Sequence, residues 1–196
     1  MAIKNTATSY GSIAKWLHWL TAALFLAAYM SVYYRQWFTE EKTPANWTAL
    51  QLHLSIGITI GVIVVLRIIW KILNRTPDLE PGSRLEHLAA HGGHYGLYAI
   101  MIIMPITGYM GTGANTEYFS VFEIQKFEDT RLYSALVTDK LGLSFEQFEA
   151  PLDFIHKNIL GEWLVWILIT GHALAALYHH VVKKDQTLTK MTTKKA

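Results

Sequence analysis

Histidines near the ends of long apolar stretches are the residues of this sequence best suited to chemistry. His18 and His53 each lie near the start of such a stretch, and His156 and His172 lie at the start and in the second half of another. Hydrocarbon disfavours polar side chains, so an imidazole inside an apolar helix is by default a functional residue. Imidazole nitrogens bind transition metals and exchange protons near neutral pH. The pattern predicts a metal or proton site inside a membrane, and we favour iron.

The apolar stretches have the length of membrane-spanning helices. They cover residues 13–34, 50–73, 91–111 and 159–182, and each would extend about 30 Å as a helix. The chain is 52% hydrophobic and only 16% charged, a composition typical of polytopic membrane proteins. We expect one all-α domain over residues 1–196, a membrane four-helix bundle with a long outward-facing cap at residues 112–158.

The distribution of basic residues predicts the orientation of this bundle. Ten Lys and Arg residues lie in or beside the two terminal tails and the connection between the second and third helices, and six lie on the opposite side. By the positive-inside rule both termini are cytoplasmic and the cap faces outward. The same rule accounts for a pI near 8.7 without a nucleic-acid partner, and we expect contact with membrane lipid instead.

The absence of cysteine narrows the kind of iron site. With no Cys in the chain, iron–sulfur clusters and covalently attached c-type haem are excluded. A haem would therefore be held by axial ligands and packing alone.

Helical depth sorts the histidines into two pairs. His18 and His172 lie toward the cytoplasmic ends of their helices, whereas His53 and His156 lie toward the outer ends, so we expect one site near each membrane face. Steps of four residues from His53 reach Gly57 and Gly61, a face without side chains that would admit a flat porphyrin. The alternative is that these two glycines only allow a close helix–helix contact.

Long motifs around these histidines resemble the bacterial cytochrome b561 family. They are KWLHWLTA, LHLSIGITIGVIVVLRIIW, HGGHYGLYAIMIIMPITGYM and GHALAALYHHVVKKDQTLTKM. The resemblance implies a multi-pass protein of the bacterial inner membrane that binds two non-covalent b haems and reduces a quinone. By position, the bis-histidine ligands fall on His18, His53, His156 and His172.

The fourth ligand departs from the family pattern. In the resembling family the two fourth-helix ligands are about fourteen residues apart, whereas His156 and His172 are sixteen apart, or about 160° around an ideal helix. We expect either an irregular turn or bulge before Gly161, or another ligand. Met30 and Met110 are the alternatives, because His/Met ligation of haem is known chemistry.

Further polar residues are expected around the inner site. Arg67 lies inside the second span and needs an anionic partner there, for which a haem propionate is the candidate. His94 and His179 are candidates for the quinone site, where a proton donor beside the carbonyl oxygens is required. The alternative for His179 is a side chain that only reaches the lipid headgroups.

We expect the protein to transfer electrons across the membrane between an outward-side donor and the quinone pool. The alternatives are a superoxide:ubiquinone oxidoreductase, as in one branch of the resembling family, and the cytochrome b anchor of a larger dehydrogenase. Residues 112–153 carry eight acidic and three basic side chains, a balance that suits a basic periplasmic redox protein better than anionic superoxide. A non-redox transporter is disfavoured, because the spans lack pairs of Asp or Glu.

Overall fold

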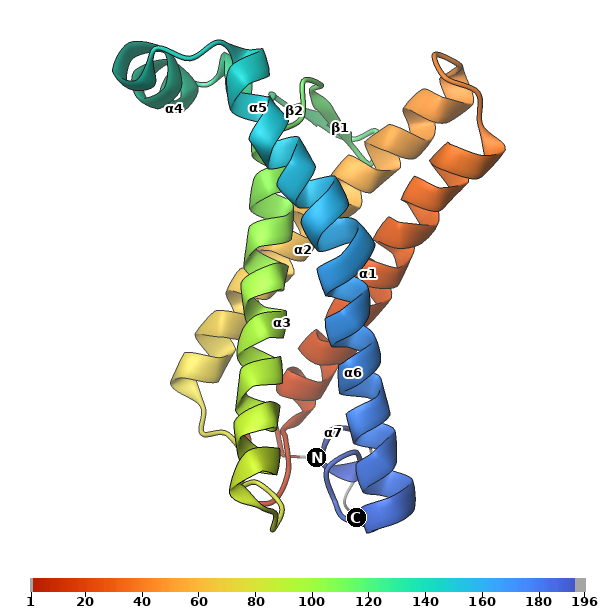
Figure 1. The fold of residues 1–196 in the computed structure, drawn as a ribbon, viewed down its shortest axis with the longest axis vertical. Coiled ribbons are helices and arrows are strands. Elements are labelled where there is room, and N and C mark those ends of the chain that lie inside the picture. The colour runs from red at the N-terminus through yellow and green to blue at the C-terminus, as the bar shows by residue number, and fades with distance from the viewer. Residues whose placement is uncertain (1, 193–196) are drawn as a thin grey trace.

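A computed structural model describes residues 2–192 of the chain, and it is mostly helical. The helices α1 (Ser12–Phe38), α2 (Pro44–Leu73) and α3 (Arg84–Met110) follow in order. A fourth helical run, Phe145–Lys183, is built from α5 (Phe145–Phe154), the π-helical segment η3 (Ile155–Leu164), α6 (Val165–Tyr178) and the π-helical segment η4 (His179–Lys183). Figure 1 shows these long elements, with the short α7 (Thr189–Thr192) beside the lower part of the fourth run.

The fourth run begins earlier than residue 159, the start expected from the apolar pattern. Ser144 forms a capping box with Gln147: the Ser144 hydroxyl accepts from the Gln147 N–H, and the Gln147 side chain accepts from the Ser144 N–H. This reciprocal bonding satisfies two backbone donors and starts a helix. Glu146, Glu149 and Asp153, which lie before the apolar stretch, occupy its first turns. The cap is therefore shorter than residues 112–158, and His156 lies inside the helix.

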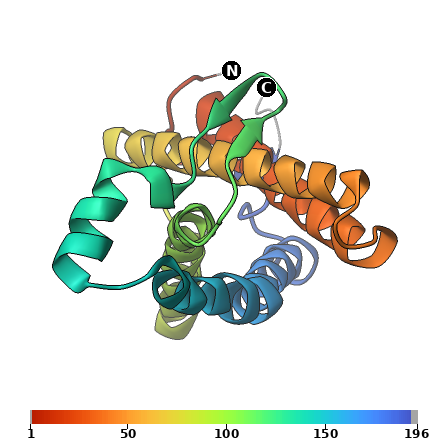
Figure 2. The same ribbon diagram turned by 90° about the horizontal axis from the view of Figure 1, so that it is seen from above.

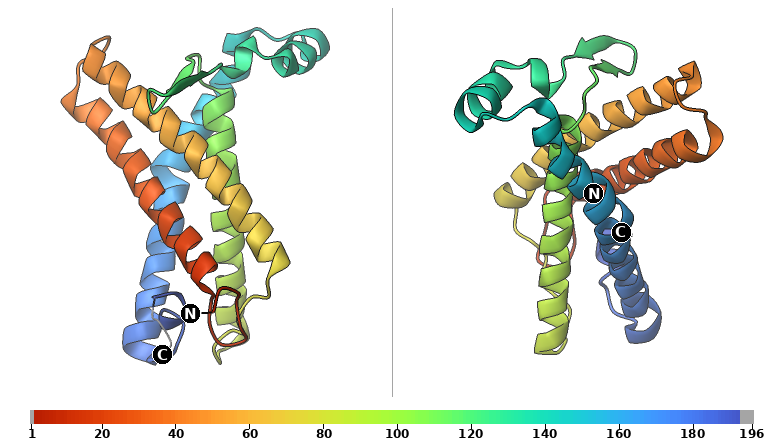
Figure 3. Two further views of the ribbon diagram at one scale, coloured as in Figure 1. Left: turned by 180° about the vertical axis from the view of Figure 1, so that it is seen from behind. Right: turned by 45° about the horizontal axis from the view of Figure 1, so that its top comes forward.

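The long elements pack in two layers. α1 and α2 run side by side as one layer, and α3 with the fourth run forms the other; toward the connection between α1 and α2 the layers diverge (Figures 1 and 3). Apolar side chains buried where the layers meet form the main core: Phe25, Ala28, Ile56, Ile60, Val64, Ile100, Met101, Leu160 and Val165. This core lies between the two levels at which the histidines occur.

The cap has its own small core and a short antiparallel hairpin. Strands β1 (Thr116–Tyr118) and β2 (Phe122–Ile124) lie over α2 (Figure 2), so the chain is not entirely α-helical. The rest of the cap holds the short 3-10 helix η1 (Phe127–Asp129), α4 (Arg131–Tyr133) and the π-helical η2 (Ser134–Leu141). Phe127, Tyr133 and Val137 are buried together, so aromatic packing holds these short elements in place.

Buried polar side chains of α2 hold the hairpin. The Gln51 amide accepts from the Glu117 N–H at 2.7 Å and donates to the Asn115 carbonyl at 3.0 Å. One turn along, the Ser55 hydroxyl accepts from the Phe119 N–H at 3.1 Å. Gln51 and Ser55 are 6% and 0% exposed, so the hairpin covers a polar strip of α2 that would otherwise be unpaired.

Three helices of the described residues are long and apolar enough to cross a membrane: Ser12–Phe38, Pro44–Leu73 and Phe145–Lys183. α3, which covers the third expected span, is 27 residues long but is less apolar, because its first half carries His87, His91 and His94 beside three glycines. Large apolar side chains are exposed on the outside of the molecule, among them Val62, Val65, Ile69, Leu174 and Leu177. Such a surface is suited to lipid.

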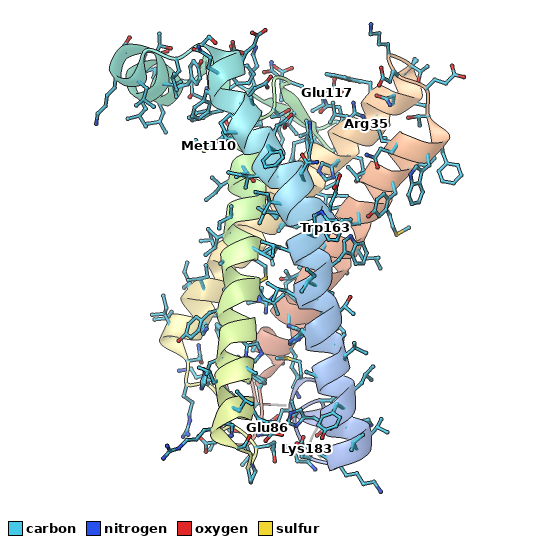
Figure 4. The ribbon with its side chains drawn as sticks, in the orientation of Figure 1. Arg35, Glu86, Met110, Glu117, Trp163 and Lys183 are labelled. Carbon is cyan, nitrogen blue, oxygen red and sulfur yellow. The ribbon has the colours of Figure 1, made fainter. Side chains whose placement is uncertain are left out.

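Both ends of the described chain lie at one end of the molecule, here called the inner end, and the cap lies at the outer end. Ion pairs close the inner end: Lys183 contacts Glu86, as Figure 4 shows, and Lys190 contacts Glu80 at 2.6 Å. The Trp19 indole donates to the Met191 carbonyl at 3.3 Å. The segment after the fourth run is thereby folded back under α1 and α3.

Candidate haem sites

The outer pair, His53 and His156, is brought together from α2 and η3. Their ring centroids are 6.3 Å apart. Two imidazoles on opposite sides of one metal, with each nitrogen about 2 Å from it, have centroids about 6 Å apart. The separation of the outer pair therefore leaves room for one metal ion that both rings could bind.

Hydrogen bonds at Nδ1 orient both rings of the outer pair. Nδ1 of His53 bonds the Ala28 carbonyl at 3.2 Å and the Ser31 hydroxyl at 3.3 Å, both on α1. Nδ1 of His156 bonds the Met104 carbonyl at 3.0 Å and the Thr107 hydroxyl at 3.2 Å, both on α3. A ring that donates its Nδ1–H to a backbone carbonyl presents the unprotonated Nε2, the tautomer needed by a metal ligand.

The ring of His156 lies in a slot on α3 that depends on glycine. A Cβ at Gly108 would be 2.8 Å from Cε1 of His156 and 3.2 Å from its Nδ1. Since real Cβ atoms do not approach so closely, only glycine admits the ring here. The slot is formed by Gly108 and by the Met104 and Thr107 oxygens, one helical turn of α3.

The π-helical segment η3 resolves the spacing of sixteen residues. Its ten residues hold about two more than the same number of α turns would, because each bond spans five residues instead of four. His156 and His172 are then separated as by fourteen α-helical steps, or about 40° around the axis. Both side chains can point inward from one continuous helix, so the irregularity expected before Gly161 is a π segment.

The inner pair, His18 and His172, joins α1 to α6 with ring centroids 6.1 Å apart. This separation also suits two ligands of one metal, but the surroundings differ from those of the outer pair. His94 of α3 is 5.6 Å from His172, and Nη2 of Arg67 is 3.3 Å from Nδ1 of His18. The inner site is thus a cluster of three imidazoles and one guanidinium.

Arg67 lacks a carboxylate partner within residues 2–192. It contacts His18, the Met101 sulfur at 3.5 Å and the face of Tyr98 at 5.6 Å. Three residues along α2, the indole Nε1 of Trp70 is buried without a hydrogen-bond partner in the part of the chain described here. A half-buried guanidinium and a buried unpaired N–H on neighbouring turns suit a carboxylate, such as a haem propionate.

The two glycines beside His53 behave differently. A Cβ at Gly57 would meet no atom within 4 Å, whereas one at Gly61 would contact the Pro105 ring at 3.5 Å. Gly61 therefore serves a helix contact, which was the alternative explanation of the motif. The open side of α2 at Gly57, one turn from His53, fits a macrocycle, so the residues of the outer site suit a haem.

The two methionines considered as ligands lie away from the outer pair. Met30 is 63% exposed on α1. Met110, at the outer end of α3 (Figure 4), packs against the aromatic core of the cap. Neither lies in the slot on α3 that holds His156.

The two candidates for the quinone site fall into separate groups. His94 lies beside His172 in the inner cluster. His179 bonds through Nδ1 to Asp185 and, at 3.3 Å, to the Thr187 hydroxyl. The His179 ring thus bonds the turn that follows the fourth run.

Several residues of the outer site were missed from the sequence. Thr107, Gly108, Ser31 and the Ala28 carbonyl contact the rings of His53 and His156, yet their residue types are common in apolar helices. The Thr-Gly pair after Pro105 was the one available signal, because a small residue and a hydroxyl there leave room and a bonding group for a neighbour.

Comparisons with known proteins identify the family. The family model described as prokaryotic cytochrome b561 matches residues 9–194. The chain is 31% identical to "Cytochrome b561 homolog 2" of Escherichia coli (strain K12), over 99% of this chain and 96% of that protein. It is 28% identical to "Probable superoxide oxidase CybB" of Yersinia pestis, over 95% and 97%, and 26% identical to "Cytochrome b561 homolog 1" of Escherichia coli (strain K12), over 90% and 92%. With the match extending over nearly its whole length, the chain belongs to the prokaryotic cytochrome b561 family.

Proposed function

We propose that this membrane cytochrome b carries electrons across the bacterial inner membrane through two b haems, between a donor on the outer side and the quinone pool. The observation that carries the proposal is the presence of two histidine pairs at two depths. His18 and Ala28, whose carbonyl contacts His53, are ten residues apart on α1, which is about 15 Å along the bundle. All four long helical segments, α3 included, would cross the membrane, with both termini in the cytoplasm.

The side chains of each pair would hold the haems. His53 and His156 would bind the outer iron, and His18 and His172 the inner one. When bound, haem iron supplies reversible one-electron transfer at a potential set by its ligands and surroundings. The Nδ1 bonds of the outer pair restrict the rotation of both rings, which would limit their reorganisation on electron transfer. The slot on α3 favours His156 over Met30 or Met110 as the fourth ligand.

At the inner end, His94 would serve quinone reduction. Its ring lies beside His172, one of the two histidines that would bind the inner haem. Reduction of a quinone to the quinol takes up two electrons and two protons, so a titratable group beside the quinone oxygens is needed. Arg67 and Trp70 would hold a propionate of the inner haem. His179, paired with Asp185, could supply a second proton path from the cytoplasm.

At the outer end, the acidic side chains of the cap would bind the electron donor. Glu117 and Glu123 line a cavity of about 420 Å³ together with Trp47, on the hairpin that is bonded to α2. Negative charge steers a basic protein toward this face. A cationic periplasmic redox protein is therefore the proposed donor, and lipid is the other contact of the bundle.

A second candidate function is superoxide oxidation coupled to quinone reduction. It is favoured by the 28% identity to a protein named as a probable superoxide oxidase. Stopped-flow addition of superoxide to the purified protein with quinone separates the two: rapid haem reduction supports the superoxide activity, and no reduction supports a protein donor. A role as the anchor of a larger dehydrogenase would appear as a peripheral subunit that copurifies.

A dithionite-reduced minus oxidised spectrum with a haem-to-protein ratio tests the central proposal. Two b haems per chain are expected, and His53→Ala and His172→Ala should each leave one. His180→Ala is the matched control, because this exposed imidazole belongs to neither pair and should leave two haems. A wild-type ratio of one, or two haems retained in both ligand variants, would contradict the proposal.

A further inference from the structure

The π-helical segment η3 requires an explanation beyond the sequence that forms it. π-helices are rare and usually limited to single turns, because their hydrogen bonding and packing are poorer than those of the α-helix. Here the segment extends over ten residues, Ile155–Leu164, with His156 in its first turn. Something outside the helix must favour the wider winding, or the segment would relax toward α-helix.

Two contacts act directly on this winding. The Tyr29 hydroxyl of α1 donates to the Gly161 carbonyl at 2.7 Å, and its ring lies 4.8 Å from that of Trp166 in α6. Within the segment, a Cβ at Gly161 would be only 2.9 Å from the His156 carbonyl. Gly161 therefore allows the close approach of its own turn to His156, and Tyr29 binds that same residue from the neighbouring helix.

Tyr29 is adjacent to a residue that orients the other ring of the outer pair. Ala28 accepts from Nδ1 of His53 through its carbonyl, and Tyr29 bonds the segment that carries His156. One turn of α1 thus contacts both arms of the outer site. A change in winding by one residue would rotate His156 by about 100° relative to α6.

We infer that Tyr29 is a positioning residue for His156: its hydrogen bond to Gly161 holds η3 in the π form and so directs the His156 ring toward His53. The inference rests on the outer haem of the proposed function. It assigns Tyr29 no contact with the haem and no part in electron transfer. Its effect is expected on the outer haem alone, because the inner pair lies on α1 and α6 outside the segment.

Tyr29→Phe in the full chain, purified with its haems, tests the inference. Hydrogen–deuterium exchange of the 155–164 peptide should rise roughly fivefold, the ratio that corresponds to one hydrogen bond worth about 1 kcal/mol. Electron paramagnetic resonance should show part of the outer haem converted from low-spin to high-spin, and redox titration should shift the outer midpoint potential only. The control is Tyr33→Phe. It also removes a tyrosine hydroxyl, one turn along α1, and keeps the ring contacts with Tyr29 and Trp37.

A second variant covers the case in which Tyr29→Phe does not fold. Gly161→Ala should push against the His156 carbonyl and produce the same outer-haem changes, whereas Gly92→Ala adds a methyl where nothing lies within 4 Å and should produce none. An unchanged outer haem in Tyr29→Phe, even with faster exchange, overturns the positioning role. Equal changes in Tyr33→Phe overturn it as well. If the wild type lacks an outer haem, the proposed function fails and so does the positioning role, while the exchange measurement still decides whether Tyr29 holds the segment.

Discussion

Gly108→Ala should remove the outer haem while leaving the inner one in place. The new Cβ would be 2.8 Å from Cε1 of His156, whereas carbon atoms in ordinary contact are about 3.5 Å apart or more. The ring must therefore retreat by about 0.7 Å. That retreat also strains the Nδ1 bonds to Met104 and Thr107, which measure 3.0 and 3.2 Å.

The energetic cost of the added methyl group in Gly108→Ala can be compared with the binding of His156 to the outer haem. Overpacking of this kind costs about 1–3 kcal/mol, and His156 can relieve it by leaving the slot. A cost of about 2 kcal/mol lowers the ratio of ligated to released His156 about 30-fold. The outer haem is then expected to lack the His156 ligand and to be lost easily from the protein during purification.

The assay is the haem-to-protein ratio with the low-spin signal measured by electron paramagnetic resonance. Gly92→Ala, an exposed glycine of the same helix whose Cβ would meet nothing within 4 Å, is the control for the added methyl. Two low-spin haems with unchanged midpoint potentials in Gly108→Ala would refute the reasoning, because His156 could not then be bound in the slot.

Three further outcomes are expected. His18→Ala should remove the inner haem and keep the outer one, as read by redox titration; loss of both would argue against independent sites. Gln51→Ala should weaken the attachment of the hairpin by about 1–3 kcal/mol, because it leaves buried backbone groups unpaired, and the Glu117 amide should exchange faster with deuterium. The pKa of Glu86 is lowered to about 2 from its ordinary value of 4.5, mainly by the hydrogen bond from the Lys183 ammonium and next by the bond from the Ser83 backbone N–H. Wild type should therefore be more stable than Glu86→Gln above pH 4.5, and thermal melting should show this difference vanish as the pH falls toward 2; a constant difference would contradict the ion pair.

The helical bundle and the histidine pairs could be predicted because they depend on local pattern and on regular rise. Apolar stretches of known length determine where helices form, and 1.5 Å per residue converts the number of a histidine into a depth. The pairing of His18 with His172 and of His53 with His156 needed no further information. The absence of cysteine likewise restricts the cofactor, because the chain has no thiolate to bind an iron–sulfur cluster or to attach a haem covalently.

The sequence also contained a signal for the start of the fourth helix, but the apolar pattern outweighed this signal. Ser144 and Gln147 have the spacing of a capping box, yet the apolar stretch that was used to place this helix begins only at residue 159. Local hydrogen bonding determined the result, because a capped amphipathic helix tolerates charge on its exposed side.

Only the tertiary structure determined how the His156 ring is held. The π winding of η3 depends on a donor from another helix, Tyr29, and the slot for His156 depends on the Gly108 backbone and two oxygens of α3. Neither follows from residue types near His156, because a carbonyl is present at every position and a glycine acts here by the side chain it lacks. The sequence alone determined which imidazoles share a depth; the packing of α1 and α3 against the fourth helix determined which way they face, since orientation depends on contacts between segments far apart in the chain.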